Sequence, residues 1–303
     1  MKRSSVNAFV WPYCTKSRTD VEFRSLLFVP GDRPERFQKA LDSAADGLIL
    51  DLEDSVAPSR KTDARQAVIE SLSLPRSKPV FVRINPIPAG GLETDLPAVL
   101  KAKPDGIVLP KAEGAKDVLD LADAMGDSPV PILPIGTETP RALFNLDTYE
   151  DVSSSLCGLT WGAEDLPATI GASGSRETDG SYTPPFEWVR SIALFAAHAA
   201  GVKAVETVYP NIKDIDGLTA YAARARRDGF TAMMAIHPSQ CQIINDAFTP
   251  SDDEIANAMK IIEAFQKNPD AGALQIDGKM VDAPHEKQAR KLVSQWKQLT
   301  DQA

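Results

Sequence analysis

The stretch GLILDLEDSVAPSRKTDARQAVIESL, residues 47–72, decides the fold. It begins with an apolar run of the kind that forms a strand buried on both faces of a parallel sheet. A charged, turn-forming segment follows. Apolar residues three and four positions apart then continue to the end of the stretch, which is typical of an amphipathic helix. One strand followed by one helix is the repeating unit of parallel α/β folds.

The same unit recurs along the chain eight times. Short apolar runs predict strands at residues 25–30, 47–54, 79–85, 106–111, 130–137, 158–166, 203–209 and 231–238. Periodic segments between them predict helices that include residues 34–44, 62–72, 115–125, 186–200 and 217–227. A doubly wound open sheet uses similar units, but eight of them favour closure. We therefore expect an α/β fold, a (β/α)8 TIM barrel over residues 25–250.

Composition and charge exclude several classes of partner. The 303 residues are 43% hydrophobic and 25% charged, which is ordinary for a soluble globular protein. The formal net charge of -9 offers no positive field to a nucleic acid or to an anionic membrane. The longest apolar stretches are far shorter than the roughly 20 residues that span a bilayer. We expect no nucleic-acid and no membrane partner, and any anionic ligand must then be held by a local basic pocket.

The N-terminal arm, residues 1–24, precedes the predicted barrel. Its basic and hydroxyl residues leave an organelle transit peptide open as an alternative to a frayed terminus. The three cysteines of the chain are too widely spaced for a disulfide framework or a CxxC metal site. This cysteine usage fits a reducing compartment, and we expect the protein to be cytoplasmic.

A C-terminal helical extension, residues 251–303, follows the barrel. Ser251 and Glu254 form a capping box for a helix that reaches about residue 268. Asp277-Gly278 predicts a hairpin turn, and a last amphipathic helix is expected over residues 284–299. We judge this extension too short to own a core, so we expect it to pack on the barrel or on a neighbouring subunit.

Polar side chains stand at the carboxyl ends of the predicted strands, where a barrel keeps its catalytic groups. Glu138 and Asp165 follow the fifth and sixth strands, which are neighbours, so both carboxylates can share one hard cation. Mg²⁺ prefers such oxygen ligands, whereas the three histidines are scattered and give no zinc spacing. Two roles stay open for the acidic residues of the second strand, binding metal-bound waters or forming salt bridges with Lys111 and Arg83: Asp51, Glu53 and Asp54.

Arg83 ends the third strand, beside the expected cation. A fixed guanidinium at this place suits a carboxylate or a developing enolate oxygen, with an internal ion pair as the alternative. His237, in the eighth strand, is interpreted as a hydrogen-bonded packing residue rather than a base. The chain has no nucleophile elbow and no phosphate-binding loop, so acyl-enzyme chemistry and phosphoryl transfer lack support.

Eight segments, in order along residues 25–300, carry a resemblance to a known family. They are SLLFVPGDRPERFQKAL (25–41), LILDLEDSVAPSRKTDAR (48–65), FVRINP (81–86), ILPIGTETPRALFNL (132–146), WGAEDLPATIGASGSRET (161–178), VYPNIKD (208–214), IHPSQ (236–240) and GKMVDAPHEKQA (278–289). The chain resembles the citrate lyase β-subunit-like and malyl-CoA lyase family of the HpcH/HpaI aldolase superfamily, closest in motif to citramalyl-CoA and malyl-CoA lyases. Members of that family are (β/α)8 barrels, typically trimers or larger.

The resemblance implies a role for each matching residue. Glu138 and Asp165 match the family's magnesium ligands, and Glu138 also lies at the substrate. Arg83 matches the arginine that binds the substrate and the enolate oxygen. Phe28 and Lys39 match residues that contact coenzyme A, with Arg36 able to share or replace the role of Lys39. Asp282 matches the aspartate that a neighbouring subunit's tail delivers as proton donor, which would explain the extension.

The resemblance also implies the reaction. The expected enzyme is a Mg²⁺-dependent lyase that cleaves a 3-hydroxy dicarboxylic acyl-CoA thioester, such as citramalyl-CoA or malyl-CoA, to acetyl-CoA and a 2-oxo acid. A homotrimer or hexamer is expected. The alternatives are the citryl-carrier-protein lyase β subunit of a multi-subunit citrate lyase and a pyruvate aldolase acting on free hydroxy acids. The sequence leaves open the 2-oxo acid released, the carrier of the thioester, trimer or hexamer, and thioesterase rather than lyase chemistry.

Overall fold

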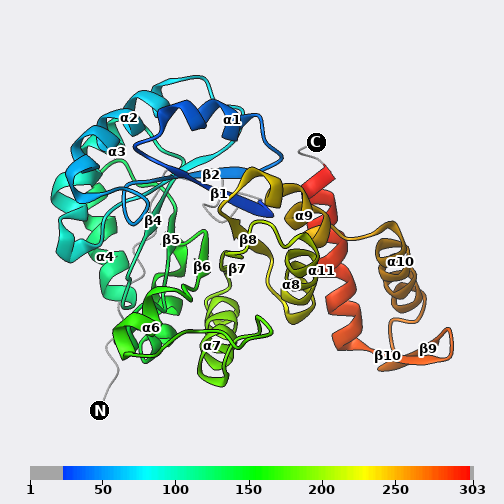
Figure 1. Cartoon of the computed structure of the whole chain (residues 1–303). Helices are drawn as coiled ribbons and strands as arrows, with labels where there is room; N and C mark the ends of the chain where they lie inside the picture. The colour runs from blue at the N-terminus through cyan, green and yellow to red at the C-terminus, as the bar shows by residue number, and fades with distance from the viewer. Residues whose placement is uncertain (1–22, 301–303) are drawn as a thin grey trace, which may run out of the picture.

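The computed structural model describes residues 23–300 and contains an eight-stranded parallel sheet that closes into a barrel (Figure 1). The sheet order is β5-β4-β3-β2-β1-β8-β7-β6. Single parallel bridges, Ile132 to Leu156 and Ile135 to Thr160, join the two ends of this order. The predicted TIM barrel is confirmed, with these strands: β1 (Ser25–Pro30), β2 (Gly47–Asp51), β3 (Val80–Arg83), β4 (Gly106–Leu109), β5 (Ile132–Pro134), β6 (Gly158–Thr160), β7 (Lys203–Glu206) and β8 (Ala232–Ala235).

Helices and short helical turns connect the strands and cover the outside of the barrel (Figure 1). The five helices that periodicity predicts are present, each within a few residues of its expected ends. Shorter turns at the mouth were not predicted. The elements are η2 (Pro34–Arg36), α1 (Phe37–Leu41), η3 (Pro58–Arg60), α2 (Lys61–Ser73), η4 (Ile87–Ala89), η5 (Gly91–Asp95), α3 (Leu96–Lys101), α4 (Ala115–Met125), α5 (Pro140–Leu143), η6 (Leu146–Ser155), α6 (Asp165–Ile170), α7 (Pro184–Ala199), α8 (Ile215–Asp228) and α9 (Pro238–Phe248).

Most of the strands end earlier than the apolar runs suggest. The sixth strand was expected over residues 158–166, but β6 ends at Thr160, and α6 begins at Asp165 after a short loop. The fifth was expected over residues 130–137, but β5 covers Ile132–Pro134. Buried residues beyond these ends, such as Ile135 and Trp161, lie outside the strands but still pack in the apolar core, so burial there does not indicate more strand.

Two apolar layers hold the barrel together. The larger one lies between the sheet and its helices and includes Leu48, Leu50 and Val82. The smaller one fills the inside of the barrel, with Ile49, Phe81 and others on the inward face, and the partly buried Phe28 at its edge. Because side chains alternate along a strand, each strand serves both layers.

The C-terminal extension consists of α10 (Asp252–Lys267), the hairpin β9 (Ala273–Ile276) and β10 (Lys279–Asp282), and α11 (Ala283–Thr300). The predicted capping box and hairpin turn are both present, the latter with positive φ at Asp277 and Gly278. The two helices pack along each other, and Phe265 and Val281 are buried. The extension therefore buries some apolar surface, although neither of the two described apolar core clusters includes any of its residues.

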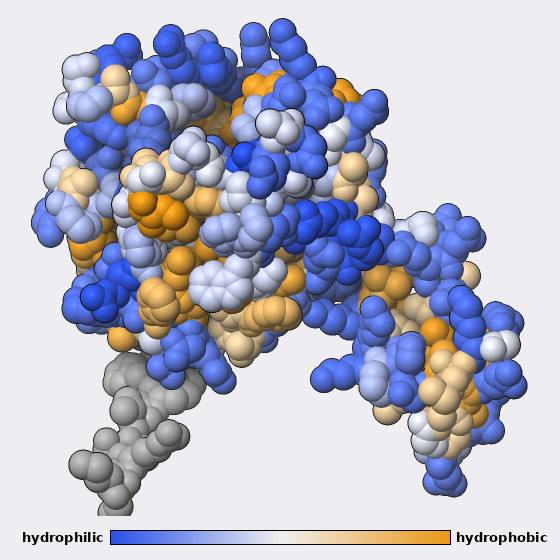
Figure 2. Space-filling model, turned by 60° about the horizontal axis from the view of Figure 1, so that its bottom comes forward, coloured by the Kyte–Doolittle hydropathy of each residue, from blue (hydrophilic) through white to orange (hydrophobic). Residues whose placement is uncertain are grey.

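The extension forms a lobe beside the barrel in the space-filling view (Figure 2). Met259 and Met280 are exposed on it, at 51% and 72% of their surface. The greater part of the N-terminal arm, residues 1–22, lies outside the described residues. The alternative of a transit peptide therefore falls on residues that the structure does not describe. None of the helices within residues 23–300 is long and apolar enough to cross a membrane.

Candidate functional site

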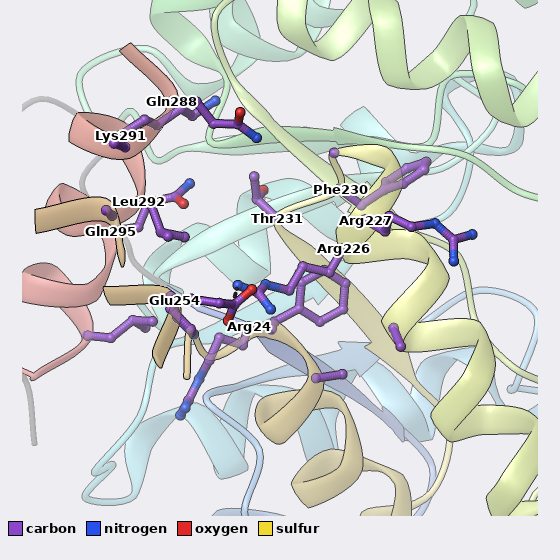
Figure 3. Close-up of a pocket in the computed structure, with 18 of the residues that line it drawn as sticks. Arg24, Arg226, Arg227, Phe230, Thr231, Glu254, Gln288, Lys291, Leu292 and Gln295 are labelled. Atoms are coloured by element: carbon purple, nitrogen blue, oxygen red, sulfur yellow. Dashed lines mark hydrogen bonds and ion pairs between the residues drawn. The ribbon is translucent and has the colours of Figure 1, made fainter. Parts of the chain in front are cut away.

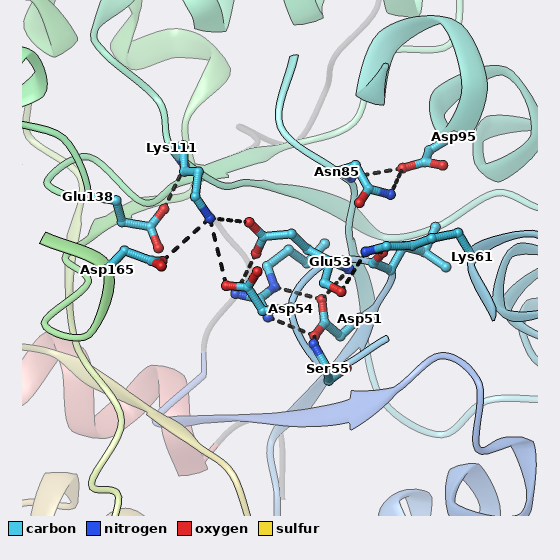
Figure 4. A network of polar contacts seen from close by, with 12 residues as sticks. Asp51, Glu53, Asp54, Ser55, Lys61, Asn85, Asp95, Lys111, Glu138 and Asp165 are labelled. Atoms are coloured by element: carbon cyan, nitrogen blue, oxygen red, sulfur yellow. Dashed lines mark hydrogen bonds and ion pairs between the residues drawn. The ribbon is translucent and has the colours of Figure 1, made fainter. Parts of the chain in front are cut away.

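Charged side chains from five βα units meet at the carboxyl ends of the strands, with Lys111 at their centre (Figure 4). The ammonium Nζ of Lys111 donates to Glu53 Oε1 at 2.6 Å and lies 3.5 Å from Asp165 Oδ2. The main-chain N–H of the same lysine donates to Glu138 Oε2 at 2.6 Å. Glu138 and Asp165, predicted as neighbours from the order of the strands, are thus brought together around one residue.

Glu138 is buried and electrostatically unfavourable as an anion. Only 4% of its surface is exposed. Burial and the adjacent Asp165 carboxyl raise the pKa of Glu138 well above its ordinary value, against the stabilising N–H of Lys111. Gly162 makes room for this side chain, because a Cβ at that position would stand 2.7 Å from Glu138 Cγ.

Arg83 is held by one edge of its guanidinium. Its Nε and Nη2 donate to the two carboxylate oxygens of Asp51, each at 2.7 Å. Its Nη1 lies 2.9 Å from Glu53 Oε2 as an ion pair without hydrogen-bond geometry. The ring of Phe28 stacks under the guanidinium, 4.7 Å from its carbon. Because a guanidinium has five N–H groups, the pairs with Asp51 and Glu53 leave others for a ligand.

The acidic residues of β2 and its following loop form the salt bridges that the sequence left open. Burial would raise the pKa of Asp51, but the bonds from Arg83 outweigh it and lower that pKa. Burial raises the pKa of Glu53, with Arg83 and Lys111 opposing the shift. Asp54 is more exposed and lies 3.7 Å from Lys111 Nζ. Asp51 and Glu53 therefore already have close cationic partners, whereas Glu138 is held by a neutral amide.

This donor set fits a hard divalent cation. The mouth offers oxygen atoms from two carboxylates that lie close enough to perturb each other, and Mg²⁺ commonly binds through one or two carboxylates and several waters. A cation between them would relieve the burial of negative charge at Glu138. No cluster of three or more histidine, cysteine or acidic ligands was found within residues 23–300.

Two of the expected site residues form no hydrogen bond or ion pair with the charged side chains of this mouth. Asp282 ends β10 in the extension, where its carboxylate pairs with His285 Nδ1 at 2.5 Å. That contact lowers the pKa of Asp282. Lys39 is exposed on α1. A role of Asp282 at the mouth needs a second subunit.

Sequence reasoning misjudged one residue and undervalued two others. His237 is not a packing residue: it is exposed and caps α9, its Nδ1 accepting from Ser239 N. Lys111 was considered only as a salt-bridge partner, although it contacts Glu138, Glu53 and Asp165. The signal was present, since Lys111 ends the apolar run 106–111 just as Arg83 and Glu138 stand at the ends of the two neighbouring strands. Gly162 had no signal, because its importance lies in a contact with a distant residue.

A second cavity lies at the amino-terminal end of the barrel strands, opposite the mouth, and Figure 3 shows residues that line it. It has a volume of about 720 Å³. It lies between the N-terminal ends of β1, β7 and β8 on one side and the extension on the other. Several lining cations already have acidic partners: Arg24 pairs with Asp46, and Arg226 pairs with Glu254. Since barrel enzymes react at the carboxyl ends of their strands, we assign the chemistry to the mouth and not to this cavity.

Comparison with known proteins identifies a family and several similar chains. Residues 24–238 match the model of the family described as HpcH/HpaI aldolase/citrate lyase. The citrate lyase subunit beta-like protein of Mycobacterium tuberculosis is 38% identical over 85% of this chain and 90% of its own length. The mitochondrial citramalyl-CoA lyase of Mus musculus is 31% identical, over 89% and 85%. The (3S)-malyl-CoA thioesterase of Cereibacter sphaeroides is 32% identical, over 90% and 94%.

A solved structure is similar over nearly the whole chain. It is protein CitE from Mycobacterium tuberculosis in complex with magnesium, acetoacetate and coenzyme A. The two chains have a TM-score of 0.76 and 36% sequence identity, with 92% of this chain and 99% of that chain covered. The similarity includes most of the extension, because the 92% of this chain that is covered is more than the barrel and the N-terminal arm together.

Proposed function

Because the chain belongs to the HpcH/HpaI aldolase/citrate lyase family, a family of lyases, we propose that it cleaves a carbon-carbon bond in a 3-hydroxy dicarboxylic acyl-CoA thioester with the help of Mg²⁺. The products would be acetyl-CoA and a 2-oxo acid. Citramalyl-CoA, malyl-CoA or a close relative is the proposed substrate. The complexes of the similar CitE with magnesium and coenzyme A support both the cofactor and the class of substrate.

One observation carries the proposal. At the mouth, Glu138 and Asp165 lie side by side without the short cationic partners that Asp51 and Glu53 have. An anionic pair of this kind supports a cation site, and the adjacent Arg83 supports the binding of an anionic substrate. The same side chains would have little use in a barrel that only binds a neutral ligand.

We propose that Glu138 and Asp165 hold the Mg²⁺ ion. When bound, the ion would supply positive charge to the carboxylate and 3-hydroxyl oxygens of the substrate. Lys111 and Gly162 would keep Glu138 in the position that this requires, the first by its N–H and the second by leaving space.

Arg83 is proposed to bind the substrate and to stabilise the reaction. As the bond between C2 and C3 of the acyl chain breaks, a general base takes the hydroxyl proton, the C3–O bond becomes a carbonyl, and the electron pair of the broken bond moves toward the thioester oxygen. The N–H groups of Arg83 that are free of Asp51 and Glu53 are suited to this developing charge. The ion pairs with Asp51 and Glu53 and the ring of Phe28 hold the guanidinium in place before the substrate binds. Little reorganisation is therefore needed during the reaction.

The enolate carbon then needs a proton, and we propose Asp282 of a neighbouring subunit as its donor. The position of Asp282 on the hairpin of the extension supports delivery to another subunit rather than to its own mouth. We accordingly propose a homotrimer or hexamer. Phe28 and Lys39 are proposed to contact the coenzyme A portion, Phe28 from beneath Arg83 and Lys39 from the surface of α1.

We propose a cytoplasmic location, which the free thiols of Cys157 and Cys241 support. Two other functions are alternatives to the lyase, because relatives with similar sequence identity to this chain are named for different activities. A thioesterase would hydrolyse the same substrate with a positioned water, and a citrate lyase β subunit would need a carrier protein and a partner subunit. Sequence identity does not separate them.

The test is a product assay of the purified protein with (S)-citramalyl-CoA and malyl-CoA, with Mg²⁺ and with EDTA. Mg²⁺-dependent release of acetyl-CoA together with a 2-oxo acid is expected. Glu138→Gln and Asp165→Asn should abolish it, whereas Glu70→Gln on the exposed face of α2 serves as the matched control. Free coenzyme A without a 2-oxo acid would favour the thioesterase. Turnover only after adding a carrier protein and partner subunit would favour the citrate lyase subunit.

A further inference from the structure

Lys111 has a main-chain conformation that lysine rarely adopts. It follows β4 with a φ of 52°, in the left-handed region that favours glycine. Hydrogen bonds hold the next two residues in place: Ala112 O accepts from Tyr149 Oη at 3.2 Å, and Glu113 O accepts from Asn145 Nδ2 at 2.8 Å. The surrounding structure thus imposes the conformation, as is common where backbone strain serves a site.

This conformation gives the two ends of Lys111 different contacts. The main-chain N–H donates to Glu138 Oε2, while the ammonium donates to Glu53 Oε1 and lies near Asp165 Oδ2 (Figure 4). The N–H is a neutral group that orients one proposed metal ligand. The ammonium is a full positive charge beside the other.

We propose that Lys111 is a positioning residue that adjusts the Mg²⁺ affinity of the mouth in two opposite directions. The N–H raises the affinity, because it fixes the oxygen atoms of Glu138 where a cation can use them. The ammonium lowers it, because its charge repels the cation and competes for Asp165. The inference rests on the proposed function, in which Glu138 and Asp165 hold the ion.

Neutral substitutions separate the two effects. Lys111→Gly and Lys111→Asn remove the charge, yet both residues tolerate positive φ, so the N–H should stay on Glu138. They should bind Mg²⁺ at least about tenfold more tightly than the wild type, since a charge within a few ångströms of the ion is lost. Lys111→Val also removes the charge, but its branched side chain opposes positive φ. It should bind Mg²⁺ at least about tenfold more weakly than Lys111→Gly.

The chain offers a matched control in Lys103, an exposed lysine with a φ of 55° before β4. Lys103→Gly also removes a lysine charge and the strain of a side chain at positive φ, but at a position away from the mouth. Its Mg²⁺ affinity should equal that of the wild type. A merely structural role of Lys111 would predict weaker binding in every Lys111 variant and could not produce tighter binding.

The experiment is calorimetric titration of Mg²⁺ into the full-length, substrate-free proteins, with circular dichroism to confirm folding. Tighter binding by Lys111→Gly or Lys111→Asn supports the effect of the ammonium, and equal or weaker binding by both overturns it. Equal affinities of Lys111→Val and Lys111→Gly overturn the role of the N–H. If the wild type binds no Mg²⁺, the proposed metal site itself fails, and the inference fails with it.

Discussion

A single methyl group at position 162 should disable the mouth. Gly162 has no positive φ, so alanine meets no backbone obstacle there, and the change is purely one of space. An added Cβ would lie 2.7 Å from Cγ, 3.1 Å from Oε1 and 3.2 Å from Cδ of Glu138. Carbon atoms in contact prefer separations of about 3.5–4.0 Å. The Glu138 side chain must therefore move by about 1 Å.

The size of the effect follows from that displacement. A misplacement of about 1 Å at a catalytic group costs on the order of 100-fold in rate. Overpacking a filled site costs about 1–3 kcal/mol of folding free energy, which leaves the protein folded. We expect Gly162→Ala to lose about 100-fold in kcat/KM and to require more Mg²⁺ for half-maximal activity, with only a modest fall in Tm.

The assay is product release at a series of Mg²⁺ concentrations, with a thermal melt of each protein. Gly174→Ala is the matched control, because that glycine lies in the loop after α6 and an added Cβ there meets nothing within 4 Å. It should behave as the wild type. Wild-type turnover and Mg²⁺ dependence in Gly162→Ala would refute the reasoning, since the position of Glu138 would then be irrelevant to catalysis.

Three further predictions concern charged groups of the proposed site. Arg83→Lys loses the paired bonds to Asp51, so kcat should fall by about 10²–10³-fold in the product assay; an unchanged kcat would remove Arg83 from the reaction. Burial and Asp165 raise the pKa of Glu138 in the folded protein, so the folded state binds protons more tightly than the unfolded state. The wild type in EDTA should then lose stability relative to Glu138→Gln as pH rises above about 4.5, and parallel pH profiles of Tm would contradict this. Asp282→Asn should lower kcat about 100-fold or more without changing Mg²⁺ affinity. Mixed oligomers of Asp282→Asn and Glu138→Gln should recover some activity if the aspartate comes from a neighbour, and no recovery would place it within one subunit.

The sequence is sufficient for the fold because the fold depends on local periodicity. Eight apolar runs lie between residues 25 and 238, with helix patterns after several of them, and this alternation predicts a barrel regardless of where each strand ends. The ends themselves were overestimated, as at residues 158–166. Trp161 and Ala163 are fully buried beyond β6, but they belong to the apolar layer between the sheet and its helices rather than to the strand.

The site was predictable only in part, because strand order locates residues but not their partners. Glu138 and Asp165 could be placed together from their adjacent strands. The sequence could not decide which carboxylates Arg83 would engage, since Asp51, Glu53 and Asp54 all precede it within one βα unit. The register of the paired strands β2 and β3 selects Asp51, because it lies directly opposite Arg83. The contact between Gly162 and Glu138 depends on loop geometry that no local pattern encodes.

The pairing of charges also distinguishes the two kinds of carboxylate at the mouth. Arg83 is engaged at 2.7 Å by Asp51, and Lys111 at 2.6 Å by Glu53, so these acids have their charge balanced within the protein. Glu138 receives only an amide N–H, and Asp165 lies 3.5 Å from an ammonium whose shorter bond goes elsewhere. The protein thus neutralises the acids of β2 and its loop itself and leaves negative charge where the barrel opens. A buried carboxylate left in this condition is stabilised either by a proton, as its raised pKa expresses, or by a cation, and a divalent ion can serve both acids at once. The partners therefore separate the acids of the mouth: Asp51 and Glu53 support Arg83 and Lys111, which leaves Glu138 and Asp165 as the proposed ligands.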